Sequence, residues 1–132
     1  HRPQAIVLQC GADAVLEDPL SRLALSNNAH WSVVAALKTM APRVLVLGGG
    51  GYNPWAVGRL WSGVWAVLND LPVPTRLPGS AQAVLKALVW PRKATPGPEL
   101  LKALRDTPRT GRVSTVIRDR IRALQPRLKA VV

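Results

Sequence analysis

Two groups of residues in this 132-residue chain could take part in chemistry. The first is Tyr52, the only tyrosine, which directly follows four consecutive glycines in the stretch VLVLGGGGYNPW. The second is a set of carboxylates in one loop-like stretch, Asp13, Glu17 and Asp18. A neutral phenol can donate a hydrogen bond to an oxyanion that develops during acyl transfer, and carboxylates can bind a divalent cation. If the two groups lie at adjacent strand ends, this combination indicates a hydrolytic site with a metal ion.

The glycine run is open to three interpretations. It can form a tight turn without chemical function, because glycine adopts positive φ and permits close packing. It can cradle a phosphate at a helix N-terminus, but Gly48, Gly50 and Asn53 give G-x-G-x-x-N, and no Gly-Lys-Ser/Thr follows, so neither nucleotide-binding motif is complete. It can also form an active-site wall at the carboxyl end of a strand. On the residues alone, the turn and the wall both remain open.

Apolar runs predict the elements that would position these residues. Ala5–Gln9 and Val44–Leu47 are typical of buried strands in a parallel sheet. A helix is expected over about residues 28–40, and a second helix begins at Pro54 with Asn53 as its N-cap. This order predicts a βαβα unit with parallel strands, so the fold class is α/β. A two-stranded sheet cannot cover its own faces and edges, so we expect further strands from missing chain or from a partner.

The chain changes character after residue 75. Residues 1–75 carry five Lys and Arg against four acidic residues, whereas residues 76–132 carry thirteen against three. After the proline-rich connector Leu71–Gly79, helical patterns cover residues 81–89, 98–105 and 112–128. We therefore divide the chain into an α/β part, residues 1–75, and a basic helical tail, residues 76–132. The last helix has an apolar stripe and a basic face, which consist of Val113, Val116, Ile117, Ile121, Leu124 and Leu128, and of Arg112, Arg118, Arg122 and Lys129.

The basic tail raises a second class of function. Its arginine face could bind the phosphates of a nucleic acid, or it could mediate association between copies of the chain. The tail has no zinc finger or other DNA-reading motif, and Trp90 is its only aromatic residue. A solvated basic face is therefore the simpler expectation, and nucleic acid is not the favoured partner.

Other features narrow the class of protein. Cys10 is the only cysteine, which excludes an internal disulfide and favours a buried structural thiol. No apolar run approaches the roughly 18–20 residues that cross a bilayer, and the first residues do not resemble a secretory signal. We therefore expect a cytoplasmic protein with no membrane partner. The only methionine is Met40, so we expect the chain to be part of a longer protein.

Two stretches, VLQCGADAVLEDPLSRLALSNNAH and LVLGGGGYNPWAVGRLW, together resemble the C-terminal part of the zinc-dependent histone deacetylase family. The resemblance covers roughly residues 5–70 and is nearest to the bacterial acetoin-utilisation and acetylpolyamine-hydrolase-like members. It implies the C-terminal fragment of an arginase/deacetylase-like fold, a parallel sheet flanked by helices, followed by a basic helical tail.

The resemblance implies roles for individual residues. Asp18 matches an aspartate ligand of the zinc ion, and Tyr52 matches the tyrosine that stabilises the tetrahedral oxyanion. Gly50 matches the backbone wall beside the substrate, and Leu25 matches an apolar residue at the rim of the acyl-lysine tunnel.

The resemblance also shows what the chain lacks. The family's tandem histidines and its Asp-x-His ligand pair have no counterpart in this sequence, and a catalytic zinc needs three protein ligands. The remaining ligands of zinc, or of another divalent metal, are therefore absent, and the chain alone is expected to be inactive. With the missing N-terminal part of the domain, it would hydrolyse acetyl-lysine or acetylated polyamines. The alternative is an inactive basic interaction module that retains the fold and binds nucleic acid or protein, or forms a homo-oligomer.

Overall fold

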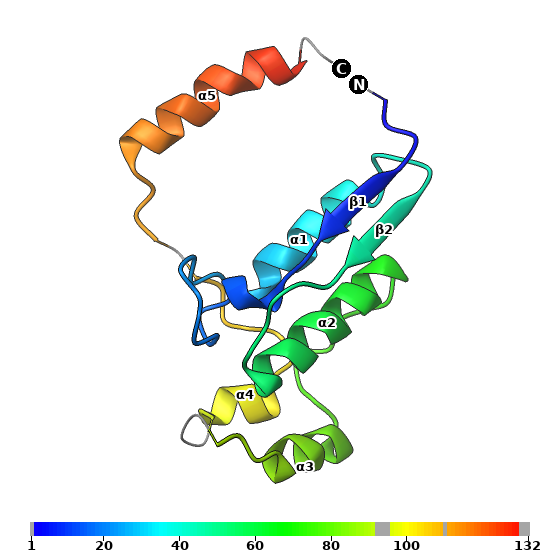
Figure 1. The fold of residues 1–132 in the computed structure, drawn as a ribbon, viewed down its shortest axis with the longest axis vertical. Coiled ribbons are helices and arrows are strands. Elements are labelled where there is room, and N and C mark those ends of the chain that lie inside the picture. The colour runs from blue at the N-terminus through cyan, green and yellow to red at the C-terminus, as the bar shows by residue number, and fades with distance from the viewer. Residues whose placement is uncertain (1, 92–95, 110, 130–132) are drawn as a thin grey trace.

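The computed structural model describes residues 2–91, 96–109 and 111–129 and confirms the α/β class (Figure 1). Two strands and their helices form one body, and a long helix lies apart from it. In chain order the elements are β1 (Ile6–Gln9), the short 3-10 helix η1 (Ala12–Ala14), α1 (Asn27–Leu37), β2 (Val44–Leu47), α2 (Pro54–Leu68), α3 (Gly79–Ala87), α4 (Pro98–Lys102) and α5 (Thr115–Lys129).

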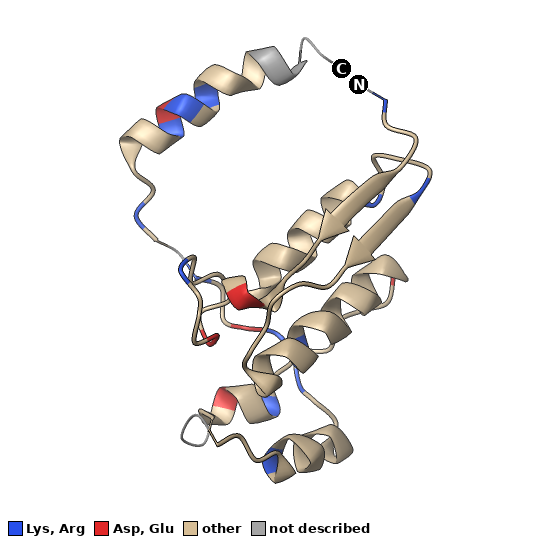
Figure 2. Ribbon diagram, viewed as in Figure 1, with Lys and Arg blue, Asp and Glu red and all other residues tan. Residues whose placement is uncertain are grey.

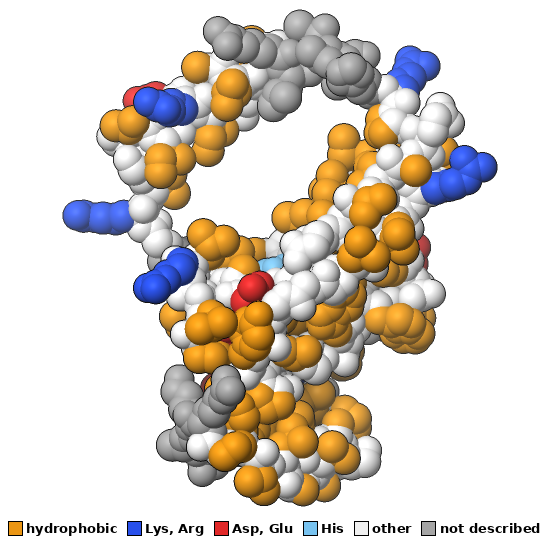
Figure 3. Space-filling view, viewed as in Figure 1, with side chains coloured by type: hydrophobic (Ala, Val, Ile, Leu, Met, Phe, Trp, Pro, Cys, Tyr) orange, Lys and Arg blue, Asp and Glu red, His pale blue; other side chains and the backbone are white. Residues whose placement is uncertain are grey.

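The two strands are parallel, as predicted, with Ile6 opposite Val44 and Gln9 opposite Leu47. One face of each strand is half-buried and the other is exposed, which agrees with the expectation that a two-stranded sheet cannot cover its own faces. Val7 is 65% exposed and Leu45 is 55% exposed, and apolar side chains gather over β1 and β2 at the surface (Figure 3). Exposure alternates along both strands, because α1 and α2 supply a covering layer for one face and no other described element covers the opposite face.

The core lies where α1 crosses α2. Trp31 and Val34 of α1 pack with Leu60 and Val64 of α2, and all four side chains are buried. The Trp31 indole N–H donates to the Leu60 carbonyl oxygen at 2.9 Å. A Cβ atom added at Gly63 would lie 2.0 Å from the Trp31 ring, so the absence of a side chain there permits the close helix crossing.

Part of the predicted tail belongs to this core. Leu104 is buried, and the buried carboxylate of Asp106 forms an ion pair with Arg59 of α2 at 2.8 Å. The same carboxylate accepts a hydrogen bond from the Asn27 backbone amide at 2.7 Å. The Asn27 side-chain amide donates to the Leu104 carbonyl at 2.8 Å. The division at residue 75 stays a prediction, but residues 104–106 are structurally joined to α1 and α2.

Several helix boundaries differ from the predicted ones. The helix α1 ends at Leu37 rather than near residue 40, and a turn follows in which the Met40 amide donates to the Leu37 carbonyl. The helix α3 covers residues 79–87 rather than 81–89. The helix α4 stops at Lys102 because Ala103 is extended and pairs with Arg76 in an antiparallel bridge.

The helix α5 begins at Thr115, three residues after the predicted start. Its residues 115–126 are all exposed, so this part of the predicted apolar stripe does not pack against another element. The side chains of Leu128 and Lys129 are not among those that the structure describes. Lys and Arg segments mark α5 and the chain that leads into it (Figure 2). In the part of the chain that the structure describes, no helix has both the length and the apolar character to cross a membrane.

Candidate active site

The chain segments that follow β1 and β2 run side by side. The Ala12 amide donates to the Gly50 carbonyl at 2.6 Å. A Cβ atom at Gly50 would lie 2.1 Å from the Asp13 carboxylate, and one at Gly51 would lie 2.9 Å from Ala12. Gly51 also has a φ of 151°, which L side chains rarely adopt. The glycine run therefore lets two backbone segments approach closely beside Tyr52.

Asp18 and Tyr52 meet at this edge of the sheet. The Tyr52 amide donates to Asp18 Oδ2 at 2.6 Å, and the Leu20 amide donates to Asp18 Oδ1 at 2.9 Å. Asp18 is buried, with 5% exposure, whereas Tyr52 is 47% exposed. The carboxylate is therefore fixed by two backbone donors, and each oxygen still has acceptor capacity for another partner.

Asn53 links the tyrosine segment to the carboxylate loop. Its side-chain oxygen caps α2 by accepting from the Trp55 amide at 3.0 Å and the Ala56 amide at 3.3 Å. Its side-chain nitrogen donates to the Glu17 carbonyl at 2.8 Å. The cap was predictable from Asn followed by Pro, but the contact with Glu17 had no signal in the sequence.

Leu25 closes the loop that carries Asp18. The Leu16 amide donates to the Leu25 carbonyl at 3.0 Å, and the Leu25 amide donates to the Ala14 carbonyl at 2.9 Å. Leu25 is 36% exposed. All four predicted site residues, Asp18, Leu25, Gly50 and Tyr52, thus belong to two adjoining segments, the loop after η1 and the glycine run after β2.

His30 and Cys10 lie near these segments in structural roles. His30 shares a hydrogen bond with the Gly11 carbonyl at 3.0 Å through Nε2, which ties α1 to the end of β1. Cys10 lies in the core, and burial raises the pKa of its thiol above the ordinary value. Neither the hydrogen bond of His30 nor the burial of Cys10 indicates a nucleophile or a metal ligand.

The residues that the structure describes do not form a complete metal site by themselves. The described part of the chain includes no group of three or more His, Cys, Asp or Glu side chains placed to hold one ion. Asp18 fits a single ligand position, since its carboxylate is buried, oriented by backbone amides and short of its full number of partners.

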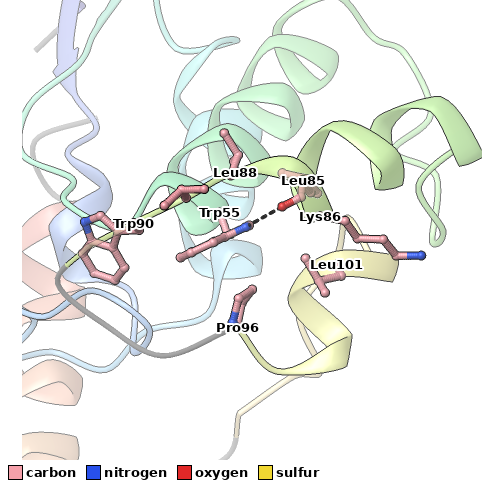
Figure 4. A pocket seen from close by; sticks show the side chains of 8 residues that line it. Trp55, Leu85, Lys86, Leu88, Trp90, Pro96 and Leu101 are labelled. Carbon is pink, nitrogen blue, oxygen red and sulfur yellow. Dashed lines mark hydrogen bonds between the residues drawn. The ribbon is translucent and has the colours of Figure 1, made fainter.

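A separate cavity of about 320 Å³ lies among α2, α3 and α4 (Figure 4). Its lining is mainly apolar, and the Trp55 indole N–H donates to the Leu85 carbonyl at 2.8 Å within it. Trp90 packs edge-on against Trp55 with 5.8 Å between ring centroids, while the Lys86 side chain points away from both rings. This cavity contains none of the predicted site residues.

Comparison with known proteins decides the family. The histone deacetylase domain family matches residues 1–68, slightly more than half of the chain. The chain belongs to the histone deacetylase family. This result confirms the resemblance found in the sequence.

Individual histone deacetylases match with partial coverage. Histone deacetylase 9 of Arabidopsis thaliana is 40% identical over 78 residues, which are 59% of this chain and 18% of that protein. Histone deacetylase 1 of Homo sapiens is 39% identical over 77 residues, 58% of this chain and 16% of that protein. The chain thus spans less than a fifth of the length of these relatives.

Solved structures match over more of the chain. The crystal structure of a histone deacetylase homolog from Aquifex aeolicus superimposes with a TM-score of 0.77 and 33% identity, over 89% of this chain and 32% of that one. A homolog complexed with SAHA gives the same TM-score and coverage. The α/β fold of this chain is therefore that of about a third of a deacetylase-homolog structure.

Proposed function

We propose that this chain contributes one wall of the active site of a zinc-dependent deacetylase, which hydrolyses acetyl amides of lysine side chains or polyamines. The observation that carries the proposal is the 2.6 Å hydrogen bond from the Tyr52 amide to the buried Asp18 carboxylate. It places a candidate metal ligand next to the residue that bears the chain's only phenol, inside a histone deacetylase fold.

Asp18 is the proposed zinc ligand. Its two backbone donors orient the carboxylate, and such outer contacts strengthen and direct a ligand. A bound zinc ion polarises the substrate carbonyl and lowers the pKa of a water molecule. The other protein ligands would come from polypeptide beyond this chain, since a zinc site of this kind needs three.

Tyr52 is the proposed oxyanion donor. Its half-exposed side chain follows Gly51 and precedes the N-cap Asn53, so its backbone is held on both sides. A phenolic O–H that donates to the oxyanion stabilises the transition state more than the ground state. Gly50 would form the backbone wall beside the substrate, and Leu25 would provide an apolar contact at the tunnel rim.

The missing N-terminal part of the domain is the proposed partner. It would cover the exposed face of the sheet around Val7 and Leu45, where apolar side chains are now exposed. The bacterial origin of the Aquifex homolog supports a relation to bacterial deacetylases of the acetoin-utilisation and acetylpolyamine-hydrolase type.

The test is an acetate-release assay on the complete protein, with an acetyl-lysine peptide and an acetylated polyamine as separate substrates. The zinc-loaded protein is expected to release acetate from at least one of them, and Asp18→Ala is expected to abolish the release. Failure of the zinc-loaded protein to release acetate from either substrate would refute the proposed function.

The exposure of α5 favours a second candidate, a basic interaction module without catalysis. Residues 115–126 are exposed on every side, and the apolar stripe lies opposite Arg118 and Arg122. A nucleic acid partner would give binding whose affinity falls steeply with salt, whereas association between copies would appear as a larger species in sedimentation. A complete protein that shows either property but releases no acetate would support this candidate.

A further inference from the structure

Arg109 contacts both ends of the loop that carries Asp18 and Leu25. One terminal nitrogen, Nη2, forms an ion pair with the Glu17 carboxylate. The other, Nη1, donates to the Leu25 carbonyl at 3.2 Å and lies 3.5 Å from the Ala24 carbonyl. A planar guanidinium presents donors in a fixed fork, so this one side chain bridges the two ends of the loop, in addition to the backbone bonds that join Leu25 to Ala14 and Leu16.

The loop between these ends has little regular structure of its own. Ala24 has a φ of 51°, a left-handed conformation that is unfavourable for a residue with a Cβ atom and that persists only when its surroundings hold it. Leu20 and Leu23 are exposed and do not anchor the loop in the core. Its shape is therefore maintained by a few local hydrogen bonds, such as that from the Leu20 amide to Asp18, and by contacts at its two ends.

The two ends are held differently. Near Asp18, the Tyr52 amide and the Asn53 side chain also hold the loop, through Asp18 Oδ2 and the Glu17 carbonyl. Near Leu25, Arg109 donates to the Leu25 carbonyl beside the backbone bonds to Ala14 and Leu16, and the Ala24 amide donates to the Ser21 hydroxyl at 3.2 Å. Loss of Arg109 would therefore leave the Leu25 end with its backbone bonds to Ala14 and Leu16, whereas the Asp18 end would keep its contacts with Tyr52 and Asn53.

Arg109 is itself well anchored. Three residues earlier, Asp106 forms the buried ion pair with Arg59 and exchanges hydrogen bonds with Asn27. Arg109 lies outside residues 1–68, the part that matches the family. A segment beyond the family match thus reaches the candidate site through a rigid support.

We propose that Arg109 is a positioning residue, which sets the place of Leu25 at the substrate rim by bridging Glu17 and the Leu25 carbonyl. The role of Leu25 as a rim residue rests on the proposed deacetylase function. The bridge itself is independent of that function, so the two can be tested separately.

Hydrogen–deuterium exchange on the chain tests the bridge. Arg109→Ala is expected to speed exchange in residues 24–26 about tenfold or more, because hydrogen bonds to charged groups are among the stronger ones. Exchange in α2 should stay at the wild-type rate, which serves as the control for folding. Arg112→Ala is the matched control, because Arg112 is exposed and lies in the same segment. Unchanged exchange in residues 24–26, or equal acceleration in α2, would overturn the proposal.

A conservative variant tests whether the forked guanidinium group, rather than its positive charge alone, holds the loop. Arg109→Lys keeps a positive charge near Glu17, but a single ammonium group does not reproduce the fork of a guanidinium. We expect Lys to leave residues 24–26 exchanging as fast as in Arg109→Ala. Wild-type protection in Arg109→Lys would overturn the bridging role.

Kinetics of the complete protein test the positioning role. Arg109→Ala should raise KM for the acetylated substrate about tenfold, while kcat and zinc content stay within about twofold, since Asp18 keeps its contacts with Tyr52 and Leu20. An unchanged KM with a loosened loop would overturn the positioning role while the deacetylase function stands. An inactive wild-type protein would instead refute the proposed function, and the exchange results would still decide the bridge.

Discussion

The Asp18 carboxylate is held by backbone amides, those of Leu20 and Tyr52, rather than by side chains. Apart from proline, a single side-chain substitution does not remove a backbone donor, so the orientation of the carboxylate depends on the shapes of the loop and of the glycine run. The same hydrogen bond fixes the backbone position from which the Tyr52 side chain projects. At the scale of residues, one hydrogen bond therefore couples the two groups that the proposed chemistry requires.

Tyr52→Phe tests the role of the phenol in the complete protein. The substitution removes one hydrogen-bond donor to the oxyanion and leaves the ring, so kcat should fall about 10²–10³-fold. The zinc content should be unchanged, because the Asp18 contact uses the Tyr52 backbone. Steady-state kinetics with parallel metal analysis measures both, and near-normal kcat would contradict the assigned role.

The reactivity of the Cys10 thiol tests whether this side chain is buried in the core. Desolvation raises the pKa of its thiol, and the side chain is buried, so little reactive thiolate is present or accessible at neutral pH. A thiol-specific reagent should label the folded chain slowly and the guanidinium-unfolded chain rapidly. Raising the pH through the folded-state pKa should speed labelling of the folded chain. Immediate full labelling of the folded chain at neutral pH would show that the thiol is not in the core.

Among the elements, α1 and α2 depend on one close contact. Gly63 faces the Trp31 ring, where a Cβ atom would lie 2.0 Å from the indole, whereas a Cβ atom at Gly58 of the same helix would meet nothing within 4 Å. The two glycines therefore form a matched pair, in which one position is required by packing and the other is open.

Gly63→Ala should lower the free energy of unfolding by about 1–3 kcal/mol, because the added methyl group forces the indole to move. Gly58→Ala should leave it unchanged or raise it by up to about 1 kcal/mol, since alanine favours the helix over glycine. Urea unfolding followed by circular dichroism compares the two variants. Equal effects of both substitutions would contradict the described helix crossing.

The elements themselves were largely predictable from local patterns. The strand Val44–Leu47 and the start of α2 at Pro54 follow directly from an apolar run and from an Asn-Pro cap. The buried Arg59–Asp106 pair and the Arg109 contacts were not predictable, because the partners are far apart in the chain and charged residues are common in a basic sequence. Incomplete coverage of the sheet was expected from its two strands, but an apolar run does not tell which of its faces is covered.

For the whole molecule, the proposal that the rest of the domain lies outside this chain accounts both for the exposed face of the sheet and for the single candidate metal ligand. The chain corresponds to about a third of the matched deacetylase-homolog structure, and its described residues supply one candidate ligand rather than a full set. We therefore expect the isolated chain to be inactive, and activity to require the remaining part of the domain. The family and the proposed roles of Asp18 and Tyr52 could be predicted from two motifs, but the support from residues 104–109 required the structure.

Metal analysis of the complete protein tests the central claim most directly, with Asp18→Ala compared with Asp13→Ala. Both substitutions remove a carboxylate from the same stretch of chain, but the Asp13 carboxylate packs against Gly50 and is not a proposed ligand. We expect Asp18→Ala to lose bound zinc and Asp13→Ala to retain it. Wild-type zinc content in Asp18→Ala would contradict the assignment of Asp18 as a zinc ligand.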